Sequence, residues 1–233
     1  LHFTYANDEI TGLEILFVDK DTVALKIPDC VTSIGVSAFS NCVNLTSVSI
    51  PDTVTSIGGN AFSSCISLKS VSIPSSVVNF GKSVFSGCSS LDHIELPTGI
   101  TAIPNGMFLG CGLTSFTIPE GVTSIGEGAF SGCESLASVT IPEGVIRIAD
   151  YAFGYCNKVE NVTIPKSVAS IGKGNFYWTK KAYFSDSRLT ITSVPGENTF
   201  SKDTVFYCYQ FSDADNWAYT HGLQTVYSDD VSL

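Results

Sequence analysis

The sequence predicts one elongated β-rich solenoid with a cap at each end, and two observations lead to this prediction. First, the text of residues 119–141, PEGVTSIGEGAFSGCESLASVTI, returns with variations after six other prolines: Pro28, Pro51, Pro74, Pro97, Pro142 and Pro165. Successive prolines are 23 residues apart, except for one step of 22. Second, apolar residues keep fixed places in every copy, so stacked copies would share one continuous core.

Each copy predicts a coil with two short extended pieces. Counting the proline as zero, apolar residues recur at +3, +6, +10, +11, +17, +20 and +22, and cysteine recurs at +14. The end of each copy, such as Leu45–Ile50, alternates apolar and polar residues, which is typical of a half-buried strand that the next proline terminates. A second extended piece is expected at Thr55–Ile57 and its counterparts, and the AFSxC segment is expected to form a 3₁₀-like or irregular corner.

The terminal segments do not match the repeat and are predicted to cap it. Residues 1–27 are expected to form an N-terminal β cap with extended pieces at 3–5, 9–18 and 23–27, and residues 28–184 an array of about seven 23-residue coils. Residues 185–233 are expected to contain a degenerate repeat at 192–200 and a strand–helix–strand cap. In this cap, strands are expected at 205–209 and 223–227, and Ser212 or Asp213 would cap a helix that Gly222 ends.

Two deviations from the repeat carry structural information. One residue is missing between Cys111 and Leu113, so this coil is expected to be tighter there and to regain its register by Phe116. The +7 position usually holds glycine but also holds Pro104 and Ala149. Since proline fixes φ near −65°, this position cannot require a positive φ, and we interpret its glycines as a requirement for space.

The eight cysteines predict a column of free thiols rather than a disulfide framework. Six of them lie 14 residues after a repeat proline: Cys42, Cys65, Cys88, Cys111, Cys133 and Cys156. Side chains of equivalent positions in adjacent coils point the same way, whereas a disulfide needs converging Cβ vectors. Cys30 and Cys208 lie near opposite ends of the chain, too far apart to pair. The sequence contains no CxxC pair, so it does not predict a zinc site.

The units IPxxVTSIGxxAFSxCxxLxSVxIP, over about residues 27–176, resemble BspA-like, or Treponema pallidum-type, leucine-rich repeats. The end, TVFYCYQFSDADNWAYTHGLQTVY, is similar to the tail that often closes such arrays, with Cys208 where that tail usually has glycine. The resemblance implies a right-handed leucine-rich repeat solenoid and, commonly, an exported bacterial surface protein used in adhesion. Related arrays also occur in eukaryotic microbes. The resemblance implies neither a catalytic site nor particular ligand residues.

Composition and the chemistry-bearing residues favour a non-enzymatic protein. A net charge of −10 disfavours nucleic acid and anionic membrane surfaces as partners. The sequence contains no run of 18 apolar residues, so it predicts no membrane span. The chain starts at Leu1 without a recognisable export signal, and we expect a secreted or cell-surface protein whose signal is not visible in this sequence. His2, His93 and His221 are far apart in the sequence, and no catalytic, cofactor or metal site is predicted.

Two alternatives to this interpretation remain open. Asp213–Asn216 is similar to the start of a calcium loop, but Ala218 and Gln224 stand where an EF-hand needs Gly and Glu, so a helix N-terminus explains these acids better. A coil near 23 residues also fits solenoid enzymes that act on polysaccharides. Those enzymes use acidic clusters, and no Asp cluster occupies equivalent positions of successive coils here.

The outward positions of the predicted strands form the candidate binding face. Most of these positions hold Ser, Thr or Asn, and His93 with Glu95 forms a charged break at the centre. We expect a protein or glycan on a host or neighbouring cell to bind Ser70, Ser72, His93, Glu95, Ser115 and Thr117, as in an adhesin. Asp29, Asp52, Glu120 and Glu143 form an acidic ridge beside this face. The alternative is that the small polar residues bind no partner and only make the surface of the sheet compatible with water.

Late aromatic residues offer a second candidate surface. Trp178, Tyr183, Trp217, Tyr219 and Tyr227 could form a platform for a sugar, or they could fill the core of the C-terminal cap.

Overall fold

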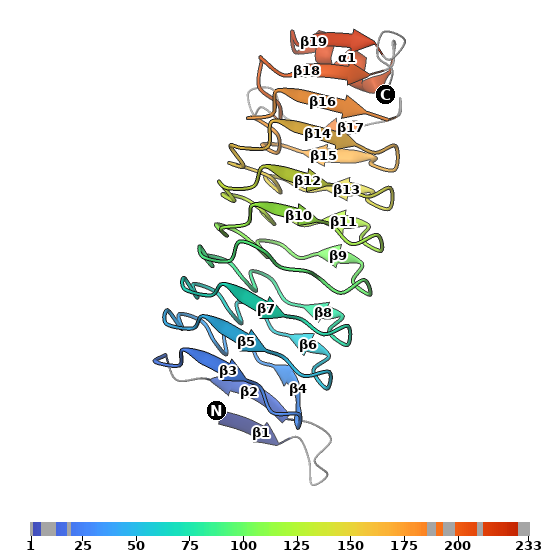
Figure 1. Cartoon of the computed structure of the whole chain (residues 1–233). Coiled ribbons are helices and arrows are strands. Elements are labelled where there is room, and N and C mark those ends of the chain that lie inside the picture. Colours follow the sequence, from blue (N-terminus) through green and yellow to red (C-terminus); the bar gives the residue numbers. More distant parts are fainter. Residues whose placement is uncertain are drawn as a thin grey trace.

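The computed structural model describes residues 2–5, 13–17, 20–185, 190–192, 199–208 and 212–227. The chain winds into stacked coils, and its first and last strands lie at opposite ends of an elongated molecule (Figure 1). Equivalent strands of successive coils pair in parallel, with equivalent residues side by side. The prediction of a β-rich solenoid with short parallel strands is therefore confirmed.

One column of strands forms what we call the front face. These strands are the alternating ends of the repeats, with the middle residue turned inward, as in Ser47–Ser49, where Val48 is buried. They form three sheets, β3-β5-β7, β10-β12 and β14-β16-β18-β19. Their bounds are β3 Ala24–Lys26, β5 Ser47–Ser49, β7 Ser70–Ser72, β10 Ser115–Thr117, β12 Ser138–Thr140, β14 Asn161–Ile164, β16 Lys181–Phe184, β18 Val205–Cys208 and β19 Gln224–Tyr227.

A second column of strands lies behind the front face and corresponds to the extended piece expected at residues 55–57. It forms two five-stranded sheets, β1-β2-β4-β6-β8 and β9-β11-β13-β15-β17. All of its pairs are parallel except β1 with β2. The bounds are β1 His2–Tyr5, β2 Leu13–Phe17, β4 Val31–Ile34, β6 Ser56–Ile57, β8 Asn79–Phe80, β9 Ala102–Ile103, β11 Ser124–Ile125, β13 Arg147–Ile148, β15 Ser170–Gly172 and β17 Thr190–Thr192.

The terminal elements follow the sequence prediction where the structure describes them. The strand–helix–strand end consists of β18, α1 (Asp213–Thr220) and β19. Ser212 caps α1 by accepting a hydrogen bond of 3.1 Å from the Asp215 N–H, and Gly222 follows with φ +68°. Parts of the extended piece expected at 9–18 and of the degenerate repeat expected at 192–200 lie outside the described residues. The division of the chain at residues 27 and 184 stays a prediction.

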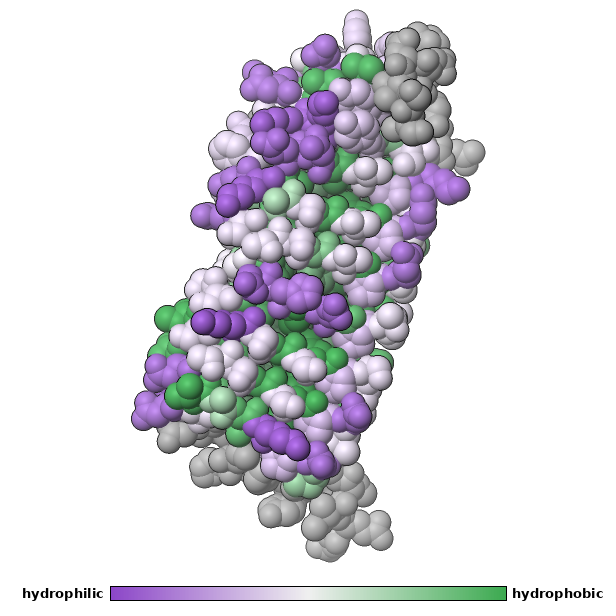
Figure 2. Space-filling model, viewed as in Figure 1, coloured by the Kyte–Doolittle hydropathy of each residue, from purple (hydrophilic) through white to green (hydrophobic). Residues whose placement is uncertain are grey.

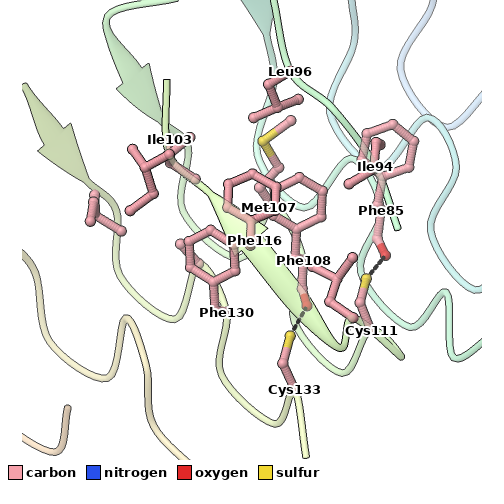
Figure 3. Packing of buried hydrophobic residues seen from close by; sticks show 14 of the residues in the cluster. Phe85, Ile94, Leu96, Ile103, Met107, Phe108, Cys111, Phe116, Phe130 and Cys133 are labelled. Atoms are coloured by element: carbon pink, nitrogen blue, oxygen red, sulfur yellow. Dashed lines mark hydrogen bonds between the residues drawn. The ribbon is translucent and has the colours of Figure 1, made fainter. Parts of the chain in front are cut away.

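The core is a set of side-chain columns that run along the stack. The Phe column runs from Phe39 to Phe200, with neighbouring rings stacked at centroid distances of 4.7–5.8 Å. The predicted cysteine column is confirmed, since all six side chains are buried and none of them forms a disulfide. Figure 3 shows two thiols donating to carbonyl oxygens of the preceding coil, Cys111 to Phe85 at 3.0 Å and Cys133 to Phe108 at 3.1 Å.

Space, rather than positive φ, explains the glycines at +7. A Cβ on Gly58 would lie 2.6 Å from the backbone nitrogen of Val36, and one on Gly81 would lie 2.2 Å from that of Gly59. The sequence did not reveal that positive φ values instead recur at +9 and +13, in the corner of the coil. Among the residues that the structure describes, seven other than glycine have φ between 54° and 61°: Ser37, Asn41, Asn60, Ser64, Ser83, Tyr151 and Tyr155.

The prediction of a strand at the end of every coil is wrong for the coil of residues 74–96. Residues 91–97 form no strand, so the front ladder stops at β7 and resumes at β10. The rear ladder still includes β8 of this coil, stops there, and resumes at β9 of the next coil. We call this interruption of both ladders the central break. The shortened coil after it is back in register at Phe116, which pairs with Val139 as expected.

Backbone chemistry and core volume explain why the coil of residues 74–96 does not pair with the coil that follows it. At +7, the N–H of Gly81 donates to Ile57 and that of Gly126 to Ile103, each at 2.8 Å. Pro104 takes this position in the shortened coil and has no N–H to donate.

Larger core side chains widen the stack at the same level. Met107 replaces the alanine found at Ala61 and Ala129, and Phe116 takes the place of Val71 and Val139. The Phe85–Phe108 centroid distance is 5.8 Å, the largest in the Phe column. The bulkier side chains and the proline together separate the two coils.

Candidate interaction surface

The six predicted face residues all lie exposed on the front face, around the central break. Ser70 and Ser72 belong to β7, Ser115 and Thr117 to β10, and His93 and Glu95 to the unpaired segment between them. The side chains of His93 and Glu95 are 68% and 89% exposed, and His93 Nε2 lies 3.6 Å from Glu95 Oε1. The structure thus places these six side chains on three successive coils.

Two hollows flank the His93–Glu95 segment. One has a volume of about 450 Å³ and lies towards the C-terminus; we call it the central hollow. Its polar lining includes Glu95, Thr98, Thr117 and Glu120, and its apolar lining includes Leu96 and Phe116. The second, of about 360 Å³, lies between this segment and Ser70–Ile73. Because the ladder is open here, the face is recessed on both sides of His93–Glu95.

Residues 93–96 carry unpaired backbone groups. All four are described by the structure, yet none of their N–H or C=O groups makes a backbone hydrogen bond. One residue earlier, the Asp92 carbonyl accepts from the Thr114 N–H at 3.2 Å, so one backbone hydrogen bond to the next coil remains just before the segment. Ile94 and Leu96 remain buried, at 5% and 9% exposure, so the segment keeps its inward packing without its ladder.

Hydrophilic side chains gather at the level of the central break. Figure 2 shows a hydrophilic band across the middle of the front face, at the height of the gap between β7 and β10 in Figure 1. The acidic ridge predicted beside the face is exposed at all four positions, Asp29, Asp52, Glu120 and Glu143. Of these four, Glu120 lines the central hollow.

The late aromatic residues do not form one platform. Trp217 packs against the core and stacks with Phe206 and His221 at centroid distances of 5.8 and 4.0 Å. Tyr183 stacks on Tyr207 at 4.6 Å, between β16 and β18. Trp178 is half exposed beside Tyr177, and Tyr219 is 85% exposed on α1. The hydroxyl of Tyr227 donates to the Asp215 carboxylate at 3.3 Å.

The described residues that could support catalysis or hold a metal lie apart from one another or are buried. Among the residues that the structure describes, no three or more His, Cys, Asp or Glu side chains are grouped as metal ligands. Asp213 and Asp215 lie in the first turn of α1, as expected for acids at a helix N-terminus. Burial raises the pKa of Cys65 and of Cys133 to about 12, so both thiols stay protonated near neutral pH.

The sequence pointed to the position of the break but not to its shape. Thr98 and the apolar residues that line the central hollow were not selected as candidates, because they are not outward positions of the predicted strands. Leu96 and Phe116 are largely buried and line a hollow only where the ladder opens. The signals that mark the opening are Pro104, Met107, Phe116 and the residue missing after Cys111. Each is visible in the sequence as a departure from its column.

The fold and face described above define a leucine-rich repeat solenoid. A family model described as BspA type leucine-rich repeat region (6 copies) matches residues 14–137 and 101–219. The chain therefore belongs to the family of BspA-type leucine-rich repeat proteins, as the resemblance of its repeats implied. No curated protein matches the chain significantly.

Solved structures of bacterial leucine-rich repeat proteins show the same fold. A leucine-rich repeat protein from Bacteroides ovatus ATCC 8483 is 23% identical with a TM-score of 0.60, covering 99% of this chain and 76% of that one. The T. pallidum leucine-rich repeat protein is 27% identical with a TM-score of 0.57, covering 67% of this chain and 86% of that one. In this chain, no helix among the described residues has the length and apolar character needed to cross a membrane.

Proposed function

We propose that this protein is a non-enzymatic, extracellular or cell-surface interaction module that binds a partner on a host or neighbouring cell, as an adhesin does. Two facts support the proposal. The chain belongs to the BspA-type leucine-rich repeat family, and leucine-rich repeat solenoids present extended surfaces suited to recognition. The partner is a protein or a glycan that binds the front face at Ser70, Ser72, His93, Glu95, Ser115 and Thr117.

The observation that carries the proposal is the pair of hollows beside His93 and Glu95. A regular ladder of small polar residues offers a partner many equivalent positions and therefore no unique register. The central break supplies a position that differs in shape and in charge from the Ser and Thr pairs of β5, β7, β10 and β12 on either side of it. Binding sites are commonly concave with a few well-placed polar groups, and the central break has both properties.

The proposal is tested with a binding screen followed by a matched comparison. The protein is applied to arrays of matrix proteins and glycans, and any binder is titrated against a His93→Ser/Glu95→Ser variant. The control is Ser56→Ala, because Ser56 lies on β6 in the rear column. We expect the double variant to weaken binding about tenfold or more and the control to have no effect. Equal affinities, or a binder that maps to the cap around Trp217, would contradict the proposal.

An enzyme acting on polysaccharide is the competing function, and no feature of the described residues favours it. A turnover assay on a glycan panel, with and without calcium, separates the two functions. The proposal expects no substrate to be consumed under either condition. Turnover that is lost in a variant of this chain would overturn it.

A further inference from the structure

The central hollow is rich in hydrogen-bond acceptors. The carboxylates of Glu95 and Glu120 line it, together with the hydroxyl oxygens of Thr98 and Thr117. Residues 93–96 beside it have carbonyl groups without backbone partners. Carboxylate and carbonyl oxygens accept hydrogen bonds and donate none. A group that enters this space is therefore favoured if it brings several donors.

The charge around the hollow is negative and is not neutralised by the neighbouring sequence. Residues 83–146, which span the central break, contain six acidic residues and no Lys or Arg. His93 can act as a counterion, since its Nε2 lies 3.6 Å from Glu95 Oε1, and both side chains are more than half exposed. An ion pair this exposed contributes little free energy, so an incoming cation can replace it.

We propose that the central hollow binds a Lys or Arg side chain from a basic, extended segment of a partner protein. This inference rests on the proposed function, because it assumes that the front face is the binding face. Arginine fits the site best, since its planar guanidinium carries five donors and a fixed positive charge. The aliphatic part of the side chain packs on the apolar lining, Leu96 and Phe116. A sulfated or otherwise anionic glycan would be repelled by the same carboxylates.

Glu120 and Glu143 provide a matched pair of positions for the test. Each follows a repeat proline directly, in successive coils, and each is exposed. Glu120 lines the central hollow, and Glu143 is not among the residues that line it. The substitutions Glu120→Gln and Glu143→Gln therefore remove the same charge from equivalent positions, one inside and one outside the proposed site.

The probe is a synthetic peptide of alternating Arg and Ser, with a citrulline–Ser peptide as its neutral counterpart of similar shape. Binding is measured by titration calorimetry at low and at moderate salt. We expect the Arg peptide to bind and the citrulline peptide to bind at least about tenfold more weakly, with affinity falling as salt rises. Glu95→Gln and Glu120→Gln should each weaken binding about fivefold, and Glu143→Gln less than twofold.

Three results would overturn the inference. The first is no binding of the Arg peptide at millimolar concentration, and the second is equal binding of the citrulline peptide. The third is an equal loss in Glu120→Gln and Glu143→Gln, which would indicate diffuse attraction to the acidic surface. If a screened partner still loses affinity in His93→Ser/Glu95→Ser, the proposed function stands and only the cationic ligand is wrong. If that partner binds the variant normally, the proposed function fails.

Discussion

The ladder around β5 and the segment of residues 93–96 come from the same repeat but differ in pairing. β5 pairs on one side with β3 and on the other with β7, residue against equivalent residue. Residues 93–96 pair with neither neighbour, although Ile94 is buried just as Val48 is. The apolar pattern alone is thus enough to place a coil in the stack, whereas the ladder also depends on the spacing between coils.

The core, in contrast to the ladders, is continuous across the central break. The thiol of Cys111 donates to the Phe85 carbonyl at 3.0 Å, and Phe85 still stacks on Phe108. The shared core therefore joins the coils on the two sides of the break. Because the core holds the coils together without the ladders, the front face can open locally while the array stays in one piece.

The largest expected effect on stability comes from truncating a ring of the Phe column, either in a regular coil or at the central break. Phe130→Ala, in a regular coil, and Phe108→Ala, at the central break, should each lower the free energy of unfolding by about 3–5 kcal/mol, since both rings are fully buried. Urea unfolding measures the loss, and Ser131→Ala serves as a surface control. If Phe108→Ala were nearly neutral, the core would not be continuous at the break.

Alkaline pH should destabilise the protein through the cysteine column. The pKa of Cys133 is about 12 in the fold against 9.0 as the reference value, so between these values the unfolded state loses a proton that the native state keeps. The free energy of unfolding therefore falls as pH rises above about 9, by about 2 kcal/mol for this thiol at about pH 10.5.

The test of this pH effect uses Cys133→Ala and Cys111→Ala, with urea unfolding in reductant at about pH 8 and pH 10.5. Burial also raises the pKa of Cys111, so each variant should lose part of the pH dependence. A Cys30→Ser variant is the control, because Cys30 is exposed. An unchanged pH dependence in Cys133→Ala would show that this thiol is not held protonated by burial.

Replacing Pro104 by alanine should restore a backbone hydrogen bond to the preceding coil and change the free energy of unfolding only slightly. Pro104→Ala supplies an N–H at the +7 position, where Ala149 already donates to Ile125 at 2.9 Å. A regained hydrogen bond of about 1 kcal/mol is offset by the greater freedom of the unfolded chain without proline. The measurement is hydrogen exchange of the new amide, expected to be protected like that of Ala149. Rapid exchange would show that core volume alone separates the coils.

Most of the fold was predictable because each column repeats in six or seven copies. The Phe and Cys columns, the second short strands, the cap of α1 and the glycine requirement at +7 all follow from the recurrence of single positions. The positive φ values at +9 and +13 could not be predicted, because Ser, Asn, Gly and Tyr all occur there. A side chain that varies gives no sign of a conserved backbone geometry.

The candidate site was predictable in position but not in form. His93 and Glu95 differ from the Ser and Thr pairs of β5, β7, β10 and β12, so the sequence identified where the face changes. The hollow beside them depends on Pro104, Met107 and Phe116, which lie in three different columns of the next coil. Each deviation looks minor in its own column, and their combined effect on the distance between coils is visible only once the columns are assembled.

Hydrogen exchange of the free protein tests the central claim most directly. The amides of Ile94 and Val48 occupy equivalent, buried positions of two coils, and only Val48 belongs to a ladder paired on both sides. If the face is open at the centre, the Ile94 amide should exchange on the order of a hundredfold faster than the Val48 amide, or more. Equal protection of the two amides would mean that the ladder is continuous and that the central hollow does not exist in solution.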